Sequence, residues 1–202
     1  MTEPAVMTHE RPGVGGVSVV IPTTGRDTLA AAVDSALSQT HEVLEVLVCF
    51  DLAAVPDGVT FTDRRVRSLC VGPGAGGNGA RMAGIEAARG EIIALLDDDD
   101  VWELEKLELQ MQAISEIAAG AEDWVCGCRV TAVMPSGEEI WPRRVIRPPE
   151  RPTPFLARRR AIFGGQGFLQ SSMLVFPARL AKAVPRSSPA GWCTADPSGF
   201  RP

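Results

Sequence analysis

Hydrophobic residues along the chain occur both in short continuous runs and in longer stretches with helical spacing. Continuous runs are typical of strands that a parallel sheet buries on both faces. They predict strands at 17–21, 43–50, 66–71 and 92–96. Apolar positions three or four residues apart, or mostly small residues, predict helices at 26–39, 80–89 and 101–118.

The pattern changes in the last third of the chain. A hairpin is predicted from 124–134 and 138–146, which flank a Pro-Ser-Gly turn. A strand at 170–176 and a short helix at 177–184 follow. Strands that alternate with helices predict an α/β fold with a mostly parallel, Rossmann-like sheet, helices on both faces and the hairpin at an edge.

Length and composition fit one globular domain. The chain has 202 residues, of which 45% are hydrophobic and 22% charged. We expect a domain over 17–184, a flexible lead over 1–16, and an irregular tail over 185–202 that is truncated or altered. No apolar run reaches the length of about 18 residues that spans a bilayer, and the lead has no apolar signal-peptide segment. Five scattered cysteines indicate reduced thiols. We therefore expect a cytoplasmic protein.

Charge is divided unevenly along the chain. Residues 1–142 carry a net charge of −14 and residues 143–202 a net charge of +9. The basic part is rich in arginine: Arg143, Arg144, Arg147, Arg151, Arg158, Arg159 and Arg160. One interpretation is peripheral contact with anionic lipids at the inner membrane face, and the other is a solvated surface that balances the acidic part. Aromatic residues are only 5% of the chain, which disfavours nucleic acid as a partner.

Four consecutive aspartates, 97–100, follow directly after the apolar run at 92–96. Like charges this close repel each other by about 1 kcal/mol per pair even in water, so the cluster favours a bound cation. Carboxylate oxygens suit Mg or Mn, with phosphate oxygens and water as further ligands. Asp100 with Glu103 also matches a capping box, so one of the four has a plain structural explanation.

A second pattern suggests a different nucleotide site. Gly72, Gly74 and Gly77 match the dinucleotide fingerprint GxGxxG between a strand and a helix, and Asp97 follows 20 residues after Gly77. This pattern would indicate an NAD- or FAD-dependent Rossmann oxidoreductase. Four carboxylates would repel a bound diphosphate, however, and Gly74, Gly76 and Gly79 match the same fingerprint a second time.

Three strand ends, taken in order, carry the more specific signal. The segments VSVVIPTTGR, EVLVCFD and GNGARMAGIEAARGEIIALLDDDDVWELEKLELQ resemble the family 2 glycosyltransferases, which have the GT-A fold. The resemblance covers about 17–112 and continues weakly to 177. It implies the inverting transfer of a sugar from a nucleoside diphosphate donor to an acceptor, here unknown: a saccharide, a lipid or a small molecule.

The resemblance also implies roles for eight residues. Thr23, Thr24 and Arg26 would border the nucleotide sugar. Asp51 would accept a hydrogen bond from the base, and Arg81, in the first turn of its predicted helix, would approach the base or the diphosphate. The metal-binding DxD pair would be Asp97 and Asp99, with Asp97 also near the donor and Asp98 on the ribose side. The implied cofactor is Mg or Mn.

The chain departs from the family pattern at several positions. Phe50 stands where a second acid is usual, and Met82 where asparagine commonly follows the arginine. An inverting transfer needs a carboxylate base, but beyond Glu150 the only acid is Asp196, so no catalytic residue is assigned. Three functions stay open: an active glycosyltransferase, an inactive relative that binds the nucleotide sugar, and the oxidoreductase.

Overall fold

The computed structural model describes residues 15–117, 120–146, 150 and 169–183 of the chain. The predicted lead, apart from residues 15 and 16, and the predicted tail over 185–202 lie outside this part. In the described part of the chain, no helix has both the length and the apolar composition that a membrane span needs.

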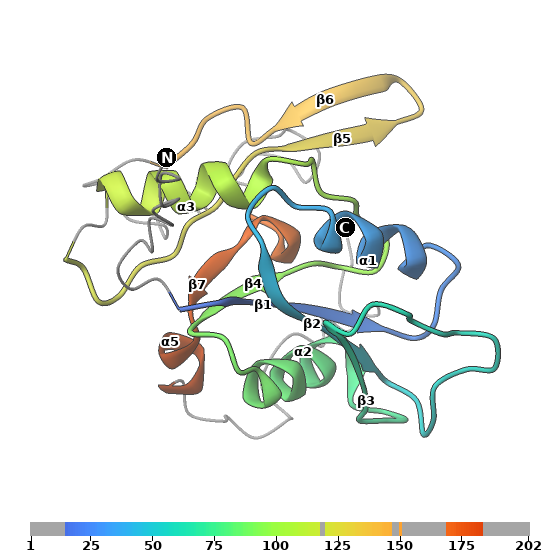
Figure 1. Cartoon of the computed structure of the whole chain (residues 1–202). Coiled ribbons are helices and arrows are strands. Elements are labelled where there is room, and N and C mark those ends of the chain that lie inside the picture. The colour runs from blue at the N-terminus through green and yellow to red at the C-terminus, as the bar shows by residue number, and fades with distance from the viewer. Residues whose placement is uncertain (1–14, 118–119, 147–149, 151–168, 184–202) are drawn as a thin grey trace, which may run out of the picture.

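A five-stranded sheet forms the centre of the domain (Figure 1). Its strands are β1 (Val17–Thr23), β2 (Val43–Phe50), β3 (Val66–Cys70), β4 (Ile92–Leu95) and β7 (Val175–Pro177). The spatial order is β3-β2-β1-β4-β7; the first four strands run parallel, and β7 is antiparallel to β4. The bounds of the four parallel strands differ from the predicted ones by at most two residues. The mostly parallel sheet is therefore confirmed.

Helices cover both faces of this sheet, as predicted. They are α1 (Leu29–Leu37), α2 (Gly76–Ala87), α3 (Lys106–Ile117) and α5 (Ala178–Ala183). Leu29 and Val33 of α1 and Leu107 of α3 pack in one apolar cluster, whereas Ile85 of α2 and Ala178 of α5 pack in the other. In Figure 1, α1 and α3 lie above the sheet, and α2 and α5 lie below it.

Helix starts are predicted less accurately than the strands of the central sheet. The first helix begins three residues later than expected, after the N-cap Thr28, and α2 begins four residues earlier than expected. The third helix begins at Lys106 instead of 101. The predicted Asp100–Glu103 capping box is wrong, because the Asp100 carboxylate instead accepts hydrogen bonds from Ser172 and Gln170.

The predicted hairpin exists but is separate from the central sheet. Strands β5 (Val130–Met134) and β6 (Gly137–Trp141) form a two-stranded sheet of their own, and both are shorter than predicted. Figure 1 shows this sheet beyond α3, and an isolated bridge between Cys126 and Val175 links the preceding loop to β7. The strand predicted at 170–176 is the 3-10 helix η1 (Ser171–Met173) followed by β7.

A buried carboxylate fixes the amino ends of the strands. Glu45 on β2 is fully inaccessible, and it accepts hydrogen bonds from Ser18 Oγ on β1 (2.8 Å) and Arg67 Nη1 on β3 (2.5 Å). The Arg89 backbone N–H (2.7 Å) and Nε (3.0 Å) also donate to it. Burial alone would raise the pKa of Glu45, but these hydrogen bonds from Arg89, Arg67 and Ser18 together hold it below its ordinary value.

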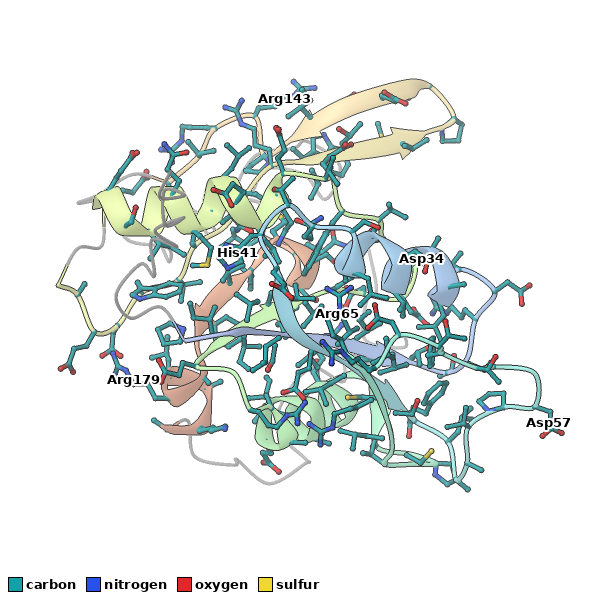
Figure 2. All side chains as sticks on the ribbon, in the orientation of Figure 1. Asp34, His41, Asp57, Arg65, Arg143 and Arg179 are labelled. Atoms are coloured by element: carbon teal, nitrogen blue, oxygen red, sulfur yellow. The ribbon has the colours of Figure 1, made fainter. Side chains whose placement is uncertain are left out.

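Arginines of the basic part that the structure describes have acidic partners. Arg143 pairs with Glu139 (3.0 Å) and Arg179 with Asp123 (2.9 Å). Figure 2 shows Arg143 beside the hairpin and Arg179 at α5, well apart from each other. Arg144 pairs with Glu150. The remaining arginines named in the sequence analysis lie outside the described residues: Arg147, Arg151, Arg158, Arg159 and Arg160.

Candidate functional site

A pocket of about 260 Å³ opens at the carboxyl ends of β1, β2 and β4. All eight predicted site residues line it: Thr23, Thr24, Arg26, Asp51, Arg81, Asp97, Asp98 and Asp99. They come from three strand ends and one helix, which meet here because the carboxyl ends of parallel strands share one edge of the sheet. Asp100, the fourth aspartate of the cluster, is not part of this lining.

The end of β1 holds two of the aspartates. Thr23 is buried, and its hydroxyl donates a hydrogen bond of 2.6 Å to Asp98 Oδ2 while accepting one from the Gly25 backbone N–H. Arg26 Nη1 lies 2.8 Å from Asp99 Oδ2 and 3.6 Å from Asp98 Oδ1. Asp98 is buried by these contacts, whereas the Asp99 side chain is 54% exposed. Asp99 therefore remains open to a ligand in the pocket.

Helix α2 brings Arg81 to the other side of the cluster. Its Nη2 lies 2.6 Å from Asp97 Oδ1, and its Nη1 donates to Asn78. Arg81 lies in the second turn of α2, not in the first as predicted, because the helix begins at Gly76. Gly84 allows this helix to approach the sheet, since a Cβ there would lie 2.5 Å from Val20 Cγ1.

Asp51 lies at the amino end of the same helix. Its two carboxylate oxygens accept the backbone N–H groups of Ala75 and Gly76, each at 2.8 Å. Ala75 is the N-cap residue and has no polar side chain, so Asp51 supplies the cap from a distant part of the chain. Gly72 is required beside it, because a Cβ there would lie 2.4 Å from the Asp51 carbonyl carbon.

This cap argues against the oxidoreductase alternative. A dinucleotide site places the pyrophosphate against free N–H groups at the start of the helix after the glycines. Here that helix is α2, and the Asp51 carboxylate already occupies its first N–H groups. Gly74 and Gly76 have positive φ angles, so the turn itself explains these two glycines.

Asp51→Ala should lower the free energy of unfolding by about 1 kcal/mol, because two helix N–H groups lose their partner. Asp51→Asn keeps an oxygen acceptor and should lose less. Urea denaturation of the three proteins measures the difference. An unchanged midpoint for Asp51→Ala would show that the cap does not stabilise α2.

Residues 170–172 lie in the segment to which the family resemblance continues weakly, but sequence reasoning did not predict that they hold the aspartates from the third side. Ser171 Oγ donates to Asp97 Oδ2 (3.1 Å), Ser172 Oγ to Asp100 Oδ2 (2.5 Å) and Gln170 Nε2 to Asp100 Oδ2 (2.7 Å). These contacts join residues at least 70 positions apart, so no local sequence pattern predicts them. Burial raises the pKa of Asp100, the charges of Asp97 and Asp99 act in the same direction, and the Ser172 hydrogen bond opposes them.

The aspartate cluster suits an ion that the protein would bind together with a ligand. Two guanidinium groups, from Arg26 and Arg81, face the three carboxylates that line the pocket, which leaves an excess of negative charge. In the described part of the chain, no three His, Cys, Asp or Glu side chains are grouped to hold a metal by themselves. Mg is commonly bound by one or two carboxylates together with the phosphates of a substrate. Asp97 and Asp99 fit that mode, since both line the pocket and Asp99 is open to it.

A mostly parallel α/β sheet with an aspartate turn at its carboxyl edge is the arrangement that the family resemblance predicts. The profile of the family named Glycosyl transferase family 2 matches residues 18–184. The chain belongs to this family.

Relatives of this chain include a named glucosyltransferase and a named succinoglycan biosynthesis protein. The UDP-Glc:alpha-D-GlcNAc-diphosphoundecaprenol beta-1,3-glucosyltransferase WfgD of Escherichia coli is 35% identical over 99 residues, which are 47% of this chain and 39% of WfgD. The succinoglycan biosynthesis protein ExoO of Rhizobium meliloti is 39% identical over 107 residues, 52% of this chain and 30% of ExoO. The chain thus spans well under half the length of either relative.

A solved structure supports the fold. The crystal structure of S. aureus TarS in complex with UDP superposes with a TM-score of 0.55 and 19% sequence identity. The superposition covers 83% of this chain and 48% of the TarS chain. The predicted GT-A architecture is therefore confirmed.

Proposed function

We propose that this domain binds a nucleoside diphosphate sugar and transfers the sugar, with inversion, to an acceptor. The observation that carries the proposal is the single pocket lined by all eight residues that the family resemblance selects. A uridine diphosphate donor is the first candidate, because the name of the E. coli relative specifies UDP-Glc and the TarS structure contains UDP.

Each polar group of the pocket would act on a part of this donor. Arg26 and Arg81 place two cations where the phosphates would lie, and cations fixed at that position stabilise the charge that grows on a leaving diphosphate. Thr23 holds the buried Asp98 through a hydrogen bond, and Asp98 would lie on the ribose side of the donor. Asp51, whose oxygens cap α2, keeps the helix and its Arg81 in place; its carboxylate would also contact the base.

Asp97 and Asp99 would be the residues that hold Mg or Mn. When bound, such an ion neutralises negative charge on the departing group. The residues themselves contribute position: Asp97 is oriented by Arg81 and Ser171, and Asp99 by Arg26.

The acceptor would approach from the far side of Asp99. A larger groove of about 1400 Å³ lies between α3 and the hairpin, and Asp99 lines both this groove and the pocket. An acceptor hydroxyl in the groove would therefore lie close to the donor sugar. The base that takes its proton is not assigned, and Asp196 lies outside the described residues.

A thermal-shift screen with nucleoside diphosphates and their sugars, each with and without Mn, tests the proposal. A ligand at 100 times its dissociation constant adds about 2.7 kcal/mol of stability, which raises the melting temperature of a domain this size by roughly 5 to 10 °C. We expect that shift for UDP or a UDP-sugar only with Mn. Release of UDP from the selected sugar nucleotide then separates an active transferase from a binding-only relative. The proposal would be contradicted if only NAD or FAD raised the melting temperature, or if none of the nucleotides did.

A further inference from the structure

The segment Gln170 to Met173 lies against the aspartate turn and is itself held rigidly. Ser172 and Met173 are buried, at 3% and 0% exposure. The Trp102 indole N–H donates to the Ser172 carbonyl oxygen (2.9 Å), and Gln110 Nε2 donates to that of Met173 (2.9 Å). The segment also continues into β7, which pairs with β4. Its donors therefore face the turn from a fixed position.

Ser172 is the centre of these contacts. Its hydroxyl accepts the backbone N–H of Asp97 (2.9 Å) and donates to Asp100 Oδ2 (2.5 Å). Asp97 and Asp100 are the first and last residues of the turn, which the Asp100 N–H closes on the Asp97 carbonyl oxygen (3.2 Å). One hydroxyl thus bonds to both ends of the four-aspartate turn.

The consequence is a division of the four carboxylates. Asp100 is bound by Ser172 and Gln170 and lines the groove, whereas Asp97, Asp98 and Asp99 line the pocket. Like charges repel, so an unrestrained turn would spread its carboxylates apart. Groups outside an ion site that orient its ligands typically account for a 10- to 100-fold difference in ion binding or activity. Ser171 contacts the Asp97 carboxylate directly, whereas Ser172 would act through the backbone N–H of Asp97 and the side chain of Asp100.

We propose that Ser172 is a positioning residue of the diphosphate site: it fixes the turn so that Asp97 and Asp99 face the same ion. This inference rests on the proposed function. It adds a residue 75 positions after Asp97, outside the three strand-end motifs.

Ser172→Ala tests the inference, with Ser18→Ala as a matched control. Ser18 is also fully buried, and its hydroxyl also accepts a backbone N–H, from Gly90, and donates to a carboxylate, that of Glu45. It lies at the opposite end of the sheet, away from the pocket. Both variants should lose stability, but only Ser172→Ala should weaken the binding of UDP with Mn, by at least tenfold in calorimetry.

Two further variants distinguish a specific loss of binding from a general folding defect. Gln170→Leu removes one donor to Asp100 at a partly exposed position, and should weaken UDP binding with Mn by a smaller factor. Ser172→Thr keeps the hydroxyl and should retain affinity. For every variant, binding of UDP without Mn should change less than binding with Mn.

The outcomes separate the two proposals. Normal Mn-dependent UDP binding by Ser172→Ala, with a melting temperature lowered as in Ser18→Ala, would show that Ser172 acts on the fold alone. In that case the proposed function would stand. If the unmodified protein itself fails to bind UDP or any other nucleoside diphosphate with Mn, both proposals fall.

Discussion

Asp99→Ala should reduce sugar transfer at least 100-fold and remove the dependence of UDP affinity on Mn. Asp99 is half exposed, lines both the pocket and the groove, and forms an ion pair with Arg26. Losing one preorganised group that acts on developing charge typically costs a factor of about 100 to 1,000 in rate. Release of UDP and calorimetry with and without Mn measure the two effects.

The effect should be specific to the site. Asp57 is a suitable control because Figure 2 shows it in the loop between β2 and β3, pointing outward. Asp57→Ala should leave transfer and binding unchanged. Asp99→Ala should also keep its melting temperature, since an exposed side chain contributes little to the fold. If the variant still binds UDP more tightly with Mn than without, Asp99 is not an ion ligand.

Glu45→Gln should lower the free energy of unfolding by about 1 to 2 kcal/mol at pH 7, because a buried carboxylate loses its charge-assisted hydrogen bonds while both arginine partners stay partly solvated. Arg67 and Arg89 both pair with this carboxylate, and the Glu45 side chain is fully inaccessible. The substitution keeps the shape and the neutral hydrogen bonds but removes the charge. Urea denaturation measures the loss.

The stability that Glu45 contributes through its two arginine partners should depend on pH. The pKa of Glu45 is lowered from its ordinary value of 4.5 in the folded protein, so its stabilisation is complete above that value. It is lost as the pH falls through the lowered pKa, because protonation then favours the unfolded chain. The stability difference between wild type and Glu45→Gln should therefore shrink in acid. Glu105→Gln, at an exposed position, should show neither effect. A difference that does not change with pH would indicate a packing defect instead of a lost charge.

Strand positions and the pocket followed from the sequence because both depend on local information. Each apolar run marks a strand, and each polar group directly after a run lies at the carboxyl edge of the sheet. Thr23, Asp51 and Asp97 could be placed near each other in this way without knowing any contact between them. The structure confirms that they line one pocket.

Partners of individual side chains could not be predicted in this way. A local signature assigned Asp100 to a capping box, but Ser172 and Gln170 bind its carboxylate instead. Asp51 resembled a free binding group, yet its oxygens cap α2. Glu45 lies in an apolar run and gave no signal of its ion pairs.

The sequence by itself determined the α/β class, the parallel strands and the set of residues at their carboxyl ends, since periodicity and strand ends are read locally. Only the tertiary structure decided how the four aspartates divide their roles, which residue caps α2, and which carboxylate ties the opposite end of the sheet. Those choices depend on packing between segments 22 to 75 residues apart, where distance in space is unrelated to distance along the chain.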